Sequence, residues 1–140
     1  MSILLFEKFR ELGLPKRDYA IFGSGPLAVR GVIPACNDLD VLCRGEFWEE
    51  VQQLGTPEYL PEYGVTIVTM ADGVIGFGTT WGIGEVDVNE LIDTAETING
   101  LSFARLEYVV RYKTIRGNKQ DQLHLNALYL SGLFSQEEQT

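Results

Sequence analysis

The sequence predicts one α/β domain, of the α+β type, in which helices pack against a mixed β-sheet. Short apolar runs typical of buried strands alternate with longer amphipathic segments typical of helices, and glycines or prolines separate them. The chain has 140 residues, of which 45% are hydrophobic, which is enough for a single hydrophobic core. We expect one domain over residues 1–140, with its core over about residues 18–133 and a flexible tail over 134–140.

The charges are mostly acidic and are unevenly distributed. The chain has 20 acidic and 11 basic residues, for a formal net charge of −9. Such a surface repels nucleic-acid phosphates, so we expect no extended nucleic-acid surface. No Lys or Arg lies between Arg44 and Arg105, whereas a short segment after it is basic. That segment holds Arg105, Arg111, Lys113, Arg116 and Lys119. We expect the acidic and basic parts to face each other or a shared anionic ligand.

The remaining composition argues against a membrane protein and a structural zinc site. The longest apolar run is far below the roughly 18 residues of a membrane span, and charges interrupt the N-terminal segment, so we expect a cytoplasmic protein without membrane contact. Cys36 and Cys43 could form one bridge, but two buried thiols are the better interpretation. His124 is the only histidine, and we interpret it as a structural hydrogen-bonding residue.

The N-terminal third predicts a helix, a strand and a second helix. Leu5, Phe9 and Leu12 form one apolar stripe, and Gly13 ends that helix. Residues 19–22 run apolar without helical periodicity, which predicts a short buried strand over residues 18–22. The glycines at 23 and 25 then turn the chain, and Pro26 suits the first position of a helix that runs to Arg30.

The middle of the chain predicts strands around one helix. Residues 38–43 begin with polar and apolar side chains in alternation, so Asp38 and Asp40 share one face of a strand. Residues 45–54 form an amphipathic helix that Gly55 ends. Residues 65–69 and 74–80 predict a hairpin with a Gly-containing turn, and residues 85–88 predict a further short strand that carries Asp87.

Two helices complete the chain. Ser102 caps the first of them, with Leu101 and Leu106 placed as a hydrophobic staple, and Gly117 ends it. Asn118 starts the last helix. Its buried stripe consists of Leu123, Ala127 and Leu130.

Three features of this arrangement point to phosphate and metal chemistry. Gly23 and Ser24 lie where a strand enters a helix, and there free N–H groups can bind phosphate oxygens, although an ordinary helix cap is the commoner reason for such a pair. Asp38 and Asp40 can hold one or two hard cations such as Mg²⁺, unless they only line a solvated strand edge. Asp87 can complete a triad of carboxylates, or can belong to a half-exposed strand.

In combination these residues resemble the nucleotidyltransferase superfamily that includes the palm of DNA polymerase β. The resemblance rests on Phe22-Gly23-Ser24, then Asp38-Leu39-Asp40-Val41, then Val86-Asp87-Val88. The segment from Lys113 through Arg116-Gly117-Asn118-Lys119-Gln120-Asp121 to His124 is similar to that of small bacterial nucleotidyltransferases of the abortive-infection toxin type. The resemblance spans roughly residues 18–128 and implies a nucleotidyltransferase-like sheet flanked by helices.

The resemblance also implies the roles of individual residues. Asp38, Asp40 and Asp87 would be the catalytic carboxylates and the ligands of Mg²⁺ or Mn²⁺, with Asp87 as the third ligand and a base. Five residues would bind the nucleoside triphosphate. They are Gly23, Ser24, Arg30, Lys113 and Lys119.

The implied reaction moves a nucleoside monophosphate from a triphosphate such as ATP to an acceptor hydroxyl, with release of pyrophosphate. The acceptor could be a small molecule, a protein or a tRNA end, and a homodimer or a partner protein could complete the site. The alternative is a non-catalytic, antitoxin-like module of the same fold that binds nucleotide or metal. A more distant alternative is an interaction protein whose acidic residues form a solvated face.

Overall fold

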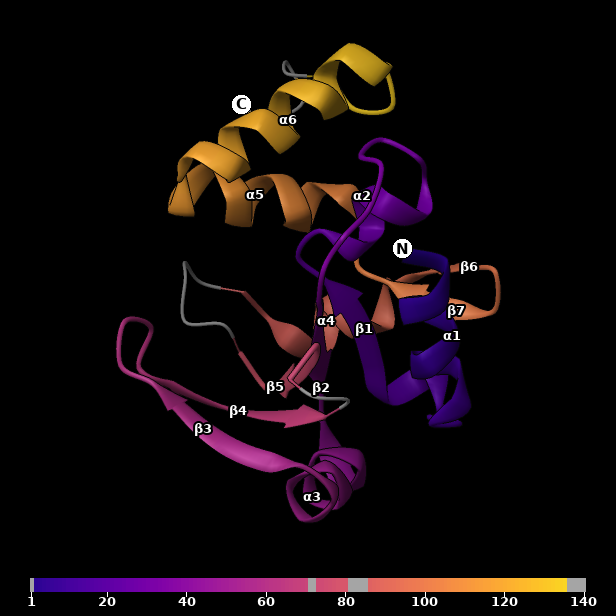
Figure 1. Ribbon diagram of the computed structural model, residues 1–140, viewed down its shortest axis with the longest axis vertical. Helices are drawn as coiled ribbons and strands as arrows, with labels where there is room; N and C mark the ends of the chain where they lie inside the picture. The colour runs from indigo at the N-terminus through magenta and orange to yellow at the C-terminus, as the bar shows by residue number, and fades with distance from the viewer. Residues whose placement is uncertain (1, 71–72, 81–85, 136–140) are drawn as a thin grey trace.

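The computed structural model describes residues 2–70, 73–80 and 86–135 and confirms the predicted mixed α/β class (Figure 1). Its helices are α1 (Ser2–Glu11), α2 (Gly25–Val29), α3 (Gly45–Leu54), α4 (Val88–Asp93), α5 (Leu106–Arg116) and α6 (Lys119–Ser131), with a 3-10 turn η1 (Lys16–Asp18). Its strands are β1 (Tyr19–Phe22), β2 (Leu39–Cys43), β3 (Thr56–Leu60), β4 (Val65–Met70), β5 (Ile75–Gly78), β6 (Glu96–Ile98) and β7 (Leu101–Phe103).

The strands form one seven-stranded mixed sheet in the order β3-β4-β5-β2-β1-β7-β6. β2 runs antiparallel to β1 and parallel to β5, so it lies at the centre of the sheet. β1 pairs in parallel with β7, and the hairpins β3–β4 and β6–β7 form the two edges. The central position of β2 places the segment that carries Asp40 between two other strands.

One face of the sheet is covered by α1 and α3. Phe9 of α1 and Phe47 of α3 pack against Tyr19, Val41 and Phe77 of the sheet, in the largest cluster of buried apolar residues. Aromatic edges meet aromatic faces there, for example between Phe9 and Tyr19, with ring centroids 5.0 Å apart. The core therefore includes the first helix, which extends it before the expected start near residue 18.

The opposite face is covered by α4 and α5. Leu91 of α4 and Tyr112 of α5 belong to a second apolar cluster with Phe22 and Leu42 of the sheet. Helix α6 lies along α5 at the end of the molecule opposite the β3–β4 hairpin (Figure 1), and Leu128 of α6 packs into a third cluster with residues of α2 and α5. This second face carries the candidate site.

The junction between α5 and α6 follows the sequence prediction closely. Gly117 ends α5 in the left-handed conformation, with φ of 58°, which a residue with a side chain rarely adopts. Asn118 then caps α6, because its side chain accepts from the backbone of Asp121 while the Asp121 side chain accepts from the backbone of Asn118. This capping box fixes the angle at which α6 leaves α5.

Two predicted elements are wrong. Ser102 does not cap a helix: it lies with Leu101 in strand β7, and α5 begins only at Leu106. The expected strand at 85–88 is not formed at its described end, because Asp87 is the N-cap of α4. The predicted hairpin of residues 65–69 and 74–80 is confirmed as the antiparallel pair β4 and β5, although its turn at residues 71–72 lies outside the described residues.

Three smaller predictions can also be compared with the structure. Cys36 and Cys43 are both buried and unbridged, as the preferred interpretation held. Phe134, expected in a flexible tail, packs against the third apolar cluster, while residues 136–140 lie outside the described part. Among the described residues, no helix is both long and apolar enough to cross a membrane.

Candidate functional site

The turn after β1 lies directly against Asp40 of β2. Phe22 pairs with Asp40 across the two strands, and Gly23 follows with φ of +64°. A Cβ atom at position 23 would stand 2.7 Å from Oδ2 of Asp40. The glycine therefore lets the backbone approach the carboxylate closely, and the turn that carries the Gly-Ser pair lies against Asp40 of the Asp-x-Asp segment.

The two aspartates differ in their surroundings. Asp40 is half-buried, whereas Asp38 is exposed just before the strand begins. Burial, and then the negative charge of Asp38, raises the pKa of Asp40 to about 6, against the opposing charges of Arg116 and Lys113. A cation bound between the two carboxylates would remove this penalty, and carboxylate oxygens are the ligands that Mg²⁺ prefers. The donor set thus fits a hard cation.

The Ser24 side chain is bound by Lys113 and does not cap α2. It precedes α2, but its side chain makes no capping hydrogen bond. Instead Lys113 Nζ donates to Ser24 Oγ at 3.1 Å, and His124 Nδ1 lies 3.3 Å from the same oxygen. Ser24 is thus the N-cap residue of α2 through its backbone only, and its hydroxyl is directed toward the C-terminal helices.

The side chain of Lys113 is buried and extends from α5 to Ser24. This side chain, from the middle of α5, is 1% exposed. Its ammonium has three partners, namely Ser24 Oγ at 3.1 Å, His124 Nδ1 at 3.2 Å and Asp121 Oδ1 at 3.4 Å. These match the three N–H donors of a lysine. Lys113 thus contributes positive charge and orients Ser24, while its own donors are used within the protein.

The carboxylate of Asp121 binds two basic side chains and the backbone at the start of α6. Its side chain is fully buried. Arg116 donates two hydrogen bonds to it, from Nε to Oδ2 at 2.7 Å and from Nη2 to Oδ1 at 2.6 Å. Burial alone would raise the pKa of Asp121, but Arg116, Lys113 and the backbone of Asn118 hold it below its usual value. The carboxylate is therefore ionised at neutral pH.

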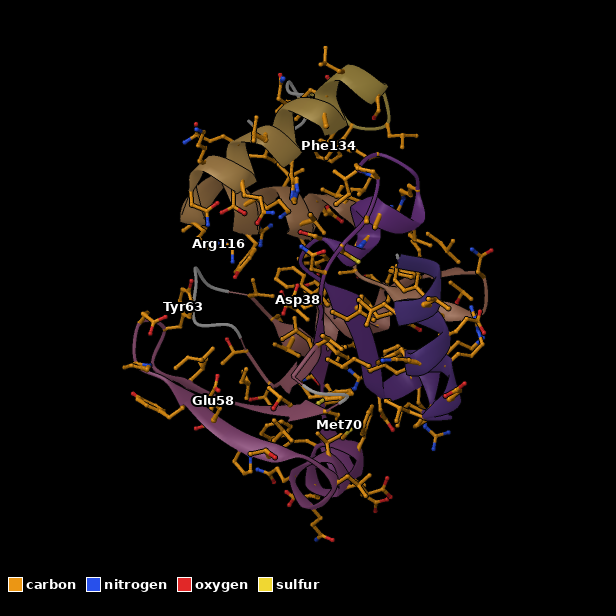
Figure 2. All side chains as sticks on the ribbon, in the orientation of Figure 1. Asp38, Glu58, Tyr63, Met70, Arg116 and Phe134 are labelled. Carbon is orange, nitrogen blue, oxygen red and sulfur yellow. The ribbon has the colours of Figure 1, made fainter. Side chains whose placement is uncertain are left out.

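Arg116 links this network to Tyr112 and to the aspartate side of the site. It donates to the Tyr112 hydroxyl at 2.9 Å, and its guanidinium lies over the Tyr112 ring, 4.8 Å from the centroid. Burial raises the pKa of Tyr112 to about 12. In Figure 2, Arg116 projects from α5 toward the region in which Asp38 lies.

His124 belongs to the same cluster and fits its structural interpretation. It is half-buried on α6, and burial together with the charge of Lys113 lowers its pKa. A neutral imidazole can accept the Lys113 hydrogen bond at Nδ1. We therefore assign the proton to Nε2.

Three residues named from the sequence lie apart from this cluster. Arg30 donates to the carbonyl of Pro26 at 2.7 Å and pairs with Glu96, so it stabilises the end of α2. Lys119 is exposed at the start of α6. Asp87 is exposed too, and its carboxylate accepts from the backbone of Glu90 as the cap of α4.

The expected triad of carboxylates is not assembled. Within residues 2–70, 73–80 and 86–135, no three His, Cys, Asp or Glu side chains are grouped closely enough to hold a metal ion. Because Asp87 caps α4 and is not on a strand beside β2, its side chain is turned to the helix start. Asp38 and Asp40 remain as a pair.

A cavity of about 320 Å³ opens beside this pair. Its walls come from β2, from β5 and from the β3–β4 hairpin. Its described lining residues are Asp38, Leu39, Asp40, Glu58, Leu60, Ile67, Thr69, Gly73 and Gly76. Figure 2 shows Glu58 on the hairpin strand and Asp38 across from it.

Sequence reasoning did not anticipate Arg116 and Asp121 as partners of Lys113, or Glu58 as a neighbour of the aspartates. The Asn118-x-x-Asp121 spacing predicts the position of Asp121, because a capping box places this acid at the start of α6. Glu58 lies in a strand that contains Pro57, and no motif marked it.

Comparisons with protein-family models, with curated proteins and with solved structures found no match to this chain.

Proposed function

We propose that this protein is a Mg²⁺-dependent nucleotidyltransferase, which moves a nucleoside monophosphate from a nucleoside triphosphate to an acceptor hydroxyl. One observation carries the proposal. Ser24, Lys113 and Asp40 come from three separate segments of the chain, and they converge around the turn at Gly23. Ser24 and Lys113 supply a hydroxyl and a positive charge for phosphate oxygens, and Asp40 with Asp38 supplies carboxylates for a cation.

Different residues of the site would bind the phosphates and the metal ion. The backbone at Gly23 and the Ser24 hydroxyl contact the phosphates, and Lys113 holds that hydroxyl in place while its charge attracts the anion. Asp38 and Asp40 would hold Mg²⁺, which when bound supplies charge neutralisation for the triphosphate. Arg116 adds positive charge on the same side, since it acts on Asp40 from α5.

The transfer has a simple balance of bonds. The acceptor oxygen forms a bond to the α-phosphorus, the bond from that phosphorus to the bridging oxygen of the β-phosphate breaks, and pyrophosphate leaves. The proton of the acceptor hydroxyl passes to solvent by way of a carboxylate of the site.

A radiochemical assay tests the proposal. The protein is incubated with each α-³²P-labelled nucleoside triphosphate, with Mg²⁺ or Mn²⁺, and with small hydroxyl compounds, tRNA and proteins as acceptors, and mass analysis then identifies any added nucleotide. Asp40→Asn should abolish both transfer and the metal-dependent part of nucleotide affinity. Glu49→Gln, an exposed change on α3 at the other face of the sheet, should leave both unchanged.

A second candidate function is a module that binds Mg²⁺-nucleotide without turnover. The arrangement of Asp87 favours it, because the carboxylate that the resemblance implies as third ligand is used to cap α4. This candidate predicts that nucleotide binds in an Asp40-dependent manner while every acceptor gives no covalent product. Transfer to any acceptor that Asp40→Asn abolishes would exclude it.

A further inference from the structure

The cavity beside Asp40 is lined on β5 by a glycine, Gly76, which has no side chain. In the register of the sheet, Gly76 of β5 lies between Thr69 of β4 and Asp40 of β2. Paired residues of neighbouring strands point to the same face, so a side chain at position 76 would project into the cavity. Because residue 76 is a glycine, β5 places no side chain in the cavity between Asp40 and Thr69.

Asp40 therefore has two different neighbours. On the β1 side lies the turn with Gly23, which leads to Ser24 and Lys113. On the β5 side lies the open cavity. A carboxylate between a phosphate-binding turn and a separate cavity is well placed between two substrates, with the donor nucleotide on one side and the acceptor on the other.

The charged residues that line the cavity, among those that the structure describes, are all acidic. Asp38, Asp40 and Glu58 contribute carboxylates, and the described lining residues include no Lys or Arg. The sequence explains this, because the whole segment from residue 45 to residue 104 contains no Lys or Arg. A cation bound by the two aspartates would offset their charge, but Glu58 on β3 would remain and would attract a positive group.

The other lining residues limit the size and character of the occupant. A volume of about 320 Å³ is at the small end of the range for ligand sites, and it suits one ring or a short chain. Leu60 and Ile67 offer apolar contact, and Thr69 offers a hydroxyl. An acceptor with phosphate groups would meet no basic side chain among the described lining residues.

We propose that this cavity binds the acceptor, and that the acceptor is a small hydroxyl compound that carries a protonated amino group. The assignment of the occupant as the acceptor rests on the proposed function. Glu58 pairs with the ammonium group, Thr69 helps to orient the ligand, and the acceptor hydroxyl is turned toward Asp40. Glu58 is thus a specificity-determining residue.

Binding measurements test this without any need for turnover. Matched compounds are titrated into the protein and followed by ligand-observed NMR, with and without Mg²⁺ and a non-hydrolysable ATP analogue. The pairs are glucosamine with glucose and ethanolamine with ethylene glycol, and glucose 6-phosphate is the anionic probe. Glu58 is exposed on β3, so we expect each amino compound to bind about twofold to fivefold more tightly than its neutral partner, as a solvent-exposed ion pair allows. Glucose 6-phosphate should not bind.

Variants assign the preference to the cavity. Glu58→Gln should remove the preference for the amino compounds. Thr69→Leu places a larger side chain beside Gly76, so it should weaken the binding of all the probes. Glu62→Gln is the matched control, because Glu62 is exposed in the turn of the same hairpin and does not line the cavity. Neither Glu58→Gln nor Glu62→Gln should change the affinity for the Mg²⁺-nucleotide analogue.

The outcomes separate the two proposals. Equal or absent binding of the amino and neutral compounds, or a preference that survives Glu58→Gln, overturns the cavity proposal. Loss of affinity for the nucleotide analogue in Thr69→Leu, with affinity for the probes retained, also overturns it, because the cavity would then hold part of the nucleotide. If the analogue fails to bind to the wild type while the Glu58-dependent preference is present, the proposed function fails and the cation-selective cavity remains.

Discussion

Gly23 lies so close to Asp40 that a Cβ atom at position 23 would stand 2.7 Å from the carboxylate oxygen Oδ2. This contact joins the turn after β1 to the central strand β2. It makes the candidate site sensitive to a single methyl group, and that sensitivity can be measured.

The first prediction uses Gly23→Ala with Gly31→Ala as its control. Both glycines have positive φ, +64° and +75°, but nothing lies within 4 Å of a Cβ at position 31. We expect Gly31→Ala to lower the free energy of unfolding by about 1 kcal/mol from backbone strain alone. Gly23→Ala should lower it by more than about 2 kcal/mol and should weaken Mg²⁺-nucleotide binding. Urea denaturation and calorimetric titration measure the two effects, and equal losses for both variants would contradict the contact.

The second prediction concerns the buried pair of Lys113 and Asp121. Asp121→Asn leaves two cations without their shared carboxylate, so it should lower the free energy of unfolding by about 3–5 kcal/mol. Lys113→Met leaves Asp121 bound to Arg116, and its loss should be about 1–3 kcal/mol. Urea denaturation measures both. The double variant should lose less than the sum, and strict additivity would show that Lys113 and Asp121 do not interact.

The third prediction follows from the pKa of Asp40. The pKa is about 6 in the folded protein and 3.8 for a free aspartate side chain, so between these two pH values the folded state binds more protons than the unfolded state. The stabilising contribution of the protonated carboxyl is complete below the unfolded pKa and is lost as the pH rises through about 6. Without divalent cations, Asp40 should therefore destabilise the protein at pH 7 relative to pH 5.

The pH effect can be assigned with Asp40→Asn. Relative to the wild type, this variant should be more stable at pH 7 by up to about 3 kcal/mol, and the difference should shrink toward pH 4. Urea denaturation in the presence of a chelator, across this range, gives the comparison. A difference that does not vary with pH would show that Asp40 does not titrate near pH 6. Added Mg²⁺ should stabilise only the wild type.

The fourth prediction separates two roles of Asp87. Asparagine caps helices about as well as aspartate does, so Asp87→Asn should change the free energy of unfolding by less than about 0.5 kcal/mol, whereas Asp87→Ala should lower it by about 1 kcal/mol. We expect Asp87→Asn to keep Mg²⁺-nucleotide affinity, which calorimetric titration measures. A loss of that affinity in a stable Asp87→Asn variant would instead support the third-ligand role.

The elements around the candidate site were predictable because strong local signals coincide there. The apolar run of β1, the glycines after it and Pro26 at the start of α2 all indicate the same turn. Gly117 and Asn118 likewise mark the boundary between α5 and α6. At these positions local preference and the final fold agree, so a single sequence is sufficient.

The elements that were missed have weaker or conflicting signals. Strand β3 contains Pro57 and Glu58, which disfavour a strand unless it lies at the edge of a sheet, as β3 does. Strands β6 and β7 have only three residues each. Their turn consists of Asn99 and Gly100, both with positive φ, and this pair is typical of a hairpin.

The candidate site was predictable in part. Gly23 lies against Asp40, and Lys113 donates to Ser24, so four residues named from the sequence lie close together. The complete burial of the lysine could not be predicted, because a lone lysine is usually exposed and its partners come from a different helix. The arrangement of Asp87 differs for a local reason, since an aspartate before a short helix also satisfies the free N–H groups of its first turn.

The position of β3 at the sheet margin also affects how copies of this protein behave toward one another. An outermost strand offers unpaired backbone groups to which another chain can add, which is a common route to aggregation. Pro57 removes one backbone donor from this margin, and Glu58 adds a charge that repels an identical strand from a second molecule. The side chain that selects a positively charged ligand would thus also help to keep the protein monodisperse, and Glu58→Gln samples call for light scattering before any titration.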